Sequence, residues 1–222
     1  MSIDDNQRSR EAVLARVRAA LGRDGPDDAA RAAAHAYLAA RAQGPRPTPP
    51  SDPVQRFLER AADMASTTAR LATVDVVPAE IARYLGGAQA RAVCWPELAA
   101  LDWSGAGLHV EVRPASGADS VGVTGCFCAI AETGTLVFAS AIDAPPATFL
   151  LPETHIAVVR GDQIVAGMED AFARLRTERG ASPRAVNLVS GPSRTGDIEQ
   201  TIVLGAHGPR HVHIVVVDAE PK

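Results

Sequence analysis

Hydroxyl, carboxyl and guanidinium groups gather in one short stretch near the C-terminus, SGPSRTGDIEQ, residues 190–200. It follows the apolar run AVNLV, residues 185–189, which predicts a buried strand. Glycines let the backbone bend and approach a ligand closely, and a guanidinium fork with hydroxyls suits a carboxylate or phosphate. A helix starting nearby would add free N–H groups. The residues of this expected anion cradle are Ser190, Gly191, Ser193, Arg194, Thr195 and Asp197.

The same stretch also has a purely structural interpretation. Asp197 followed by Gln200 resembles a capping box, in which polar side chains only begin a helix. One cap does not require a serine, an arginine and a threonine together, so both interpretations stay open. The nucleotide-binding pattern GxxxxGK[ST] is absent, which argues against a P-loop.

A second group of candidates lies in GVTGCFCAIAETGTLVF, residues 122–138. Here Glu132, Thr133 and Thr135 surround Gly134 between two apolar runs. A carboxylate at this place could act as a base, a nucleophile or a ligand anchor. The spacing alone favours a hairpin turn, with Gly134 at a positive φ and the threonines closing the turn.

The cysteines and histidines do not predict a metal centre. Cys126 and Cys128 form a CxC pair, but iron–sulfur clusters and structural zinc sites usually need four ligands. We therefore expect buried thiols and no iron–sulfur cluster on this chain. His211 and His213 would share one face of a strand, without a carboxylate beside them in the sequence. His207, in a Gly-Pro turn with Arg210, is the more exposed candidate.

Composition excludes several classes of protein. The chain has 222 residues and is 46% apolar, which suffices for one domain with a core and an extension. Its net charge of −4 gives no basic field for nucleic acid. The N-terminus does not resemble a secretory signal, and no apolar run reaches the length of a membrane span. Three cysteines fit a reducing compartment, so we expect a cytoplasmic protein.

The elements that must position these residues alternate between strands and helices. Strands are predicted at residues 72–77, 91–95, 108–112, 129–140, 155–160, 185–189 and 211–217, the fourth of these ranges holding two strands hinged at a glycine. Helical patterns lie between several of them. This alternation predicts an α/β fold with a mostly parallel sheet.

The N-terminal part differs from the rest of the chain. Helical patterns cover residues 6–21 and 27–42, and the Pro-rich stretch GPRPTPPSDP follows at residues 44–53. Such a stretch cannot be helical and has little to bury. We predict a helical extension with a linker at residues 1–50 and the main domain at residues 51–222.

Four stretches together resemble one known family: GCFCAIAETGTLVF, LLPETHIAVV, SGPSRTGDIEQTIVLGAHGPR and HVHIVVV. Their order and spacing are similar to the LUD-domain family, specifically to its lactate utilization protein C branch. The resemblance runs from about Phe57 to the C-terminus. It implies a three-layer α/β/α fold similar to the NagB/RpiA/CoA-transferase-like arrangement, with the N-terminal helices as an extension.

The resemblance also implies a role. The branch is associated with oxidation of L-lactate to pyruvate alongside iron–sulfur partner proteins, so this chain is expected to be a subunit of that system, with a small anionic metabolite as ligand. Arg194 would pair with the anion, and Glu132 or Glu199 could move a proton. His207 and Arg210 also match the family's motifs.

Other functional classes stay open. The chain could be a non-catalytic assembly or regulatory module of the same system. It could also be a stand-alone enzyme of the isomerase or acyl-transfer kind that uses Glu132. The sequence shows no flavin or nicotinamide fingerprint, so the cofactor is not identified and an electron acceptor would lie on a partner or in an unfamiliar pocket.

Overall fold

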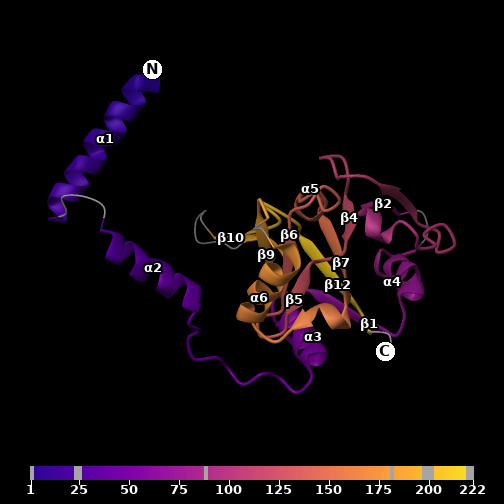
Figure 1. Cartoon of the computed structure of the whole chain (residues 1–222). Coiled ribbons are helices and arrows are strands. Elements are labelled where there is room, and N and C mark those ends of the chain that lie inside the picture. The colour runs from indigo at the N-terminus through magenta and orange to yellow at the C-terminus, as the bar shows by residue number, and fades with distance from the viewer. Residues whose placement is uncertain (1–2, 23–26, 88–89, 181–182, 197–202, 219–222) are drawn as a thin grey trace. The chain divides into compact units, whose positions relative to one another are not determined.

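The computed structural model describes residues 3–22, 27–87, 90–180, 183–196 and 203–218 (Figure 1). The chain divides into two compact units, Met1–Arg46 and Pro47–Lys222. The described residues of the first unit contain α1 (Ile3–Ala20) and α2 (Asp28–Ala40). Asp27 begins α2 because its carboxylate accepts the N–H of Ala30 at 2.9 Å.

The second unit is built on a six-stranded sheet. Its strands, in spatial order, are β1 (Thr67–Leu71), β12 (His211–Val217), β7 (Thr154–Arg160), β4 (Val121–Thr124), β2 (Arg91–Cys94) and β3 (His109–Val112). Every neighbouring pair in this sheet is parallel. The predicted α/β fold with a mostly parallel sheet is confirmed.

A second, smaller sheet packs on one face of the first and was not predicted. Its order is β8 (Ile164–Val165), β5 (Cys128–Ile130), β6 (Thr135–Ala139) and β9 (Val186–Val189). β9 pairs antiparallel with β6. The polar stretch at residues 190–200 therefore follows a strand of this mixed sheet and not a strand of the parallel one. Within this stretch, β10 (Arg194–Thr195) pairs antiparallel with β11 (Val203–Leu204) in a separate two-stranded sheet.

Helices cover the sheets and connect their strands. They are α3 (Pro53–Asp63), α4 (Val77–Tyr84), α5 (Ala147–Leu150) and α6 (Met168–Arg179), with 3-10 turns η1 (Val74–Val76), η2 (Pro96–Leu98) and η3 (Gly161–Gln163). The predicted strand at residues 72–77 is wrong, since η1 and the start of α4 occupy it. Pro78 favours a helix start because its fixed φ fits the first turn and its missing N–H needs no partner there.

The core lies on both faces of the parallel sheet. Along β12, Ile214 and Val216 join a cluster that contains Phe57 of α3 and Phe138 of the second sheet. Val215 faces the opposite cluster, which includes residues of α4. Alternate strand residues thus bury against different layers, as the two-residue period of a strand requires. Among the described helices, none combines the length and the apolar character that crossing a lipid bilayer requires.

Candidate functional site

The two polar bends found in the sequence lie side by side in the structure. Leu136 of β6 is the register partner of Val189 of β9, which places the start of one strand beside the end of the other. The Thr135 hydroxyl oxygen lies 2.7 Å from that of Ser190 and 2.7 Å from that of Thr133. Three hydroxyl groups therefore form one hydrogen-bonded chain across the bends. We call Thr133, Gly134, Thr135, Ser190, Gly191 and Arg194 the two-bend cluster.

Both glycines of the two-bend cluster pack against the end of α3. Gly134 has a φ of +66°, and an added Cβ would collide with the backbone of Arg60 and Ala61. Gly191 has a φ of +76°, and an added Cβ would collide with the Met64 carbonyl. A side chain at either position would combine a strained backbone with a clash against main-chain atoms. The glycines are needed because α3 ends between the two bends.

Arg194 reaches the same end of α3 from β10. Its Nη2 donates a hydrogen bond of 3.2 Å to the Met64 carbonyl, and the residue is exposed. A guanidinium carries five N–H donors, so one bond to a carbonyl leaves donors for a ligand. The geometry of a planar fork suits a carboxylate held in a bidentate manner.

The segment that contains the predicted residues His207 and Arg210 folds back onto the two-bend cluster. The Ser193 N–H donates to the Pro209 carbonyl at 2.9 Å, and the Gly205 N–H donates to the Ser193 carbonyl at 2.9 Å. This turn brings the exposed residues His207 and Arg210 to the segment that follows Gly191. Thr195 lies half-buried in β10.

The predicted acid–base residues are placed only in part. Glu132 is half-buried in the turn before Gly134, and its N–H donates to the Ala166 carbonyl at 3.1 Å. Asp197 and Glu199, with the helix start expected near them, lie outside the described residues. The structure thus joins Thr133, Thr135 and Ser190 directly and shows one candidate carboxylate in the same turn.

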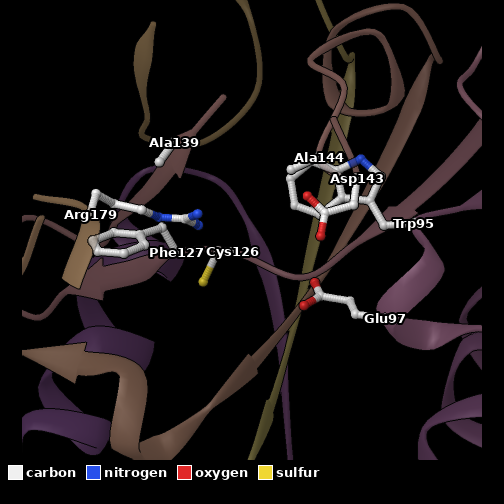
Figure 2. Close-up of a pocket in the computed structure, with 8 residues that line it drawn as sticks. All are labelled: Trp95, Glu97, Cys126, Phe127, Ala139, Asp143, Ala144 and Arg179. Carbon is white, nitrogen blue, oxygen red and sulfur yellow. The ribbon is translucent and has the colours of Figure 1, made fainter. Parts of the chain in front are cut away.

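A pocket that the sequence did not reveal lies at the carboxyl edge of the parallel sheet. β2 and β4 are neighbours; the chain continues from β2 to β3 on one side, and after β4 it passes through β5 and β6 of the second sheet and rejoins the parallel sheet as β7 on the other side. Such a switch point in an open sheet opens a crevice where ligands bind. Figure 2 shows the residues that line this pocket, whose volume is about 80 Å³. We call it the switch-point pocket; its polar walls are formed by Glu97, Cys126, Asp143 and Arg179.

Glu97 is the central carboxylate of the switch-point pocket. It also lines a neighbouring cavity of about 140 Å³ together with Arg160 and Gln163. Although the residue is exposed overall, its carboxylate lies on Gly125, where a Cβ would collide with it. Loss of hydration around the carboxyl group raises the pKa of Glu97, Asp143 adds to this, and Arg160 and the Gly125 N–H oppose it.

The cysteine in the switch-point pocket is not an activated nucleophile. Burial raises the pKa of the Cys126 thiol, and Cys128 and Glu97 add to the shift. Since the thiolate is the reactive form, a raised pKa keeps the sulfur inert. All three cysteines are free and buried, as we expected for thiols that pack as small apolar side chains.

The strand histidine His213 has a carboxylate partner that the sequence did not suggest. Its Nδ1 lies 2.8 Å from the Thr67 hydroxyl, its Nε2 lies 3.4 Å from Glu80 of α4, and its ring stacks on Tyr84. Burial lowers the pKa of His213, and Glu80 opposes that shift. Within the part of the chain that the structure describes, no group of three or more His, Cys, Asp or Glu side chains could hold a metal ion.

Sequence reasoning missed Glu97, Asp143 and Arg179. A usable signal existed for Glu97 alone, because it follows the predicted strand at residues 91–95, and the ends of parallel strands are where ligand groups gather. Arg179 ends α6, and Asp143 follows β6 in the second sheet. Their meeting depends on how that sheet packs, which no local pattern encodes.

Comparison with known proteins supports one family. The family model described as the LUD domain matches residues 72–217. Lactate utilization protein C of Deinococcus radiodurans is 35% identical over 185 residues, covering 78% of this chain and 83% of that protein. Lactate utilization protein C of Bacillus subtilis is 38% identical over 103 residues, covering 45% of this chain and 43% of that protein.

A solved structure agrees with the same assignment. The crystal structure of a DUF162 family protein from Deinococcus radiodurans has a TM-score of 0.55 and 27% identity. The similarity covers 77% of this chain and 99% of that chain. Since the family model spans more than half of the sequence, the chain belongs to the LUD-domain family.

Proposed function

We propose that this chain serves lactate utilization by binding a small carboxylate, L-lactate or pyruvate, at the two-bend cluster. The observation that carries this proposal is the 2.7 Å contact between the Thr135 and Ser190 hydroxyls, because it unites two bends that are distant in sequence. The names of the relatives from Deinococcus radiodurans and Bacillus subtilis support the choice of ligand.

The two-bend cluster offers the groups that a small carboxylate needs. Arg194 is exposed and would bind the carboxylate through its fork, while the exposed side chains of Thr133 and Ser190 would orient the rest of the ligand. Oxidation of L-lactate to pyruvate releases two electrons and two protons. We assign the electrons to iron–sulfur partner proteins, and Glu132 or Glu199 would accept a proton.

Arg194→Ala is expected to weaken L-lactate binding about tenfold or more, because a hydrogen bond to a charged group contributes roughly 1.5–3 kcal/mol. Isothermal titration calorimetry on the full-length chain measures the effect. Arg70→Ala is the matched control, since Arg70 is also exposed but pairs with Asp218 at 2.8 Å beside β1. An affinity for L-lactate that is unchanged in Arg194→Ala would contradict this ligand site.

A second candidate function is a non-catalytic assembly module. The observation that favours it is the exposure of apolar side chains on α2, where Tyr37 is 76% and Leu38 is 69% exposed. Such side chains are typical of helices that dock on a partner. The Arg194→Ala variant separates the two functions. Lost lactate oxidation with retained iron–sulfur partners supports a ligand site, whereas lost partners support a scaffold.

A further inference from the structure

The switch-point pocket carries opposite charges on facing walls. Figure 2 shows the guanidinium of Arg179 on one side and the carboxylates of Glu97 and Asp143 on the other, all directed toward the same space. Arg179 comes from the end of α6, Glu97 from the turn after β2 and Asp143 from the segment after β6. Three separate elements therefore contribute charged groups to one cavity.

The positive charge of Arg179 is available to a ligand. Its guanidinium lies 5.5 Å from the centre of the Phe127 ring, which holds it over an apolar face. Among the described residues, no carboxylate lies within salt-bridge distance of it. The neighbouring Arg174 also lies over Phe127, but it is paired with Glu178 at 2.7 Å. Among the residues that the structure describes, Arg179 thus has no acidic partner that would compete with a ligand.

The hydrogen-bonding character of the walls defines the ligand. A guanidinium only donates hydrogen bonds, and an ionised carboxylate only accepts them. A molecule that bridges the pocket must therefore present an anion to Arg179 and a donor group to Glu97 or Asp143. A volume of about 80 Å³ corresponds to a few water molecules, so the pocket suits a small ligand.

We propose that the switch-point pocket is a second ligand site that binds a small carboxylate carrying a hydrogen-bond donor on the adjacent carbon. Arg179 would bind the carboxylate, and Glu97 would accept the hydrogen bond from a 2-hydroxyl or 2-ammonium group. A 2-oxo acid fits less well, because its carbonyl oxygen would face acceptors. This site is separate from the two-bend cluster, and the proposal shares with the proposed function only L-lactate as a ligand.

Protonation of Glu97 would change the preference of the pocket. A protonated carboxyl group can donate to a carbonyl oxygen, so lower pH should favour a 2-oxo acid over a 2-hydroxy acid. Loss of hydration raises the pKa of Glu97 above its ordinary value, Arg160 and the Gly125 N–H oppose that shift, and Asp143 adds to it. Cys126 and Arg179 line the same pocket. The relative affinity for pyruvate should therefore rise as the pH falls toward that pKa.

Calorimetric titration of the full-length chain with L-lactate, L-alanine and pyruvate tests the proposal. Arg179→Ala should weaken L-lactate and L-alanine binding about tenfold or more. Glu97→Gln keeps the size of the side chain, and its amide group can donate a hydrogen bond. The affinity for pyruvate should therefore rise relative to the affinity for L-lactate. Gly125→Ala should also weaken binding, because its Cβ would displace the Glu97 carboxylate, a flexible group that can move without unfolding the protein.

The same titrations separate this site from the two-bend cluster. If both sites bind L-lactate, wild type binds two molecules per chain, and Arg179→Ala and Arg194→Ala each bind one. Binding that is lost entirely in Arg179→Ala and unchanged in Arg194→Ala supports the switch-point pocket and contradicts the ligand role of Arg194. The reverse pattern overturns the inference and leaves the proposed function standing. The inference is also overturned if the wild-type protein binds none of the three probes. It is overturned as well if wild type, Arg179→Ala and Glu97→Gln bind them with equal affinities.

Discussion

Gly134→Ala is expected to lower the free energy of unfolding by about 3 kcal/mol. Alanine at a φ of +66° costs roughly 1–2 kcal/mol, and overpacking against a neighbour costs roughly 1–3 kcal/mol more. The added Cβ would meet main-chain atoms of Arg60 and Ala61, which cannot rotate away as a side chain can. Urea unfolding followed by circular dichroism measures the change.

Alanine variants of two other glycines distinguish the backbone strain from the steric clash as causes of the lost stability. Gly86 has a φ of +84° with nothing within 4 Å of an added Cβ, so Gly86→Ala should show only the backbone cost of about 1 kcal/mol. Gly117 lacks both features, and its alanine variant should be close to wild type. If Gly134→Ala is no less stable than Gly86→Ala, then α3 does not pack against the Gly134 bend as described.

Acidification is expected to destabilise the protein between pH 6.5 and 4 through buried histidine. Burial lowers the pKa of His155 from 6.5 to about 3, because its ring lies among Phe138 and Phe149 with its Nε2 2.9 Å from the Thr124 hydroxyl. A pKa lower in the folded than in the unfolded state means that the unfolded chain binds more protons in this window. Stability is therefore complete above pH 6.5 and falls as the pH decreases.

The expected slope is about 1.4 kcal/mol per pH unit from His155, or roughly 3 kcal/mol by pH 4. His213 adds a contribution of the same sign, since its pKa is also lowered. Urea unfolding at a series of pH values measures the slope. His155→Gln should flatten it, because glutamine can bond to Thr124 without titrating. His211→Gln, at an exposed position, is the control, and identical slopes in all three proteins would refute the role of His155.

The fold was predictable where the pattern was local and strongly apolar. Residues 211–217 form a strand that pairs on both sides and is itself buried beyond His211, so five of its seven positions are apolar and the prediction is straightforward. The hairpin at Gly134 was predictable because glycine between apolar runs favours a turn. The strands β8, β10 and β11 were missed because they have two residues each, too few for any periodicity. The second sheet was missed although the regions of β5, β6 and β9 were predicted as strands, because local patterns do not show which strands pair.

The candidate site was predictable in residue type but not in arrangement. The polar groups around Gly134 and Arg194 stand out in the sequence, yet the meeting of Thr135 and Ser190 depends on antiparallel pairing between β6 and β9. The switch-point pocket depends on strand order, which brings Glu97 and Arg179 together from distant segments. Such contacts are set by tertiary packing and leave little trace in local spacing.

Growth on L-lactate tests the central claim most directly. Deleting the coding sequence of this chain from its host should abolish growth on L-lactate as sole carbon source while leaving growth on pyruvate intact. Wild-type sequence supplied in trans should restore growth, and the Arg194→Ala sequence should fail to do so at equal protein level. A deletion strain that grows on L-lactate as fast as its parent would contradict a role for this chain in lactate utilization.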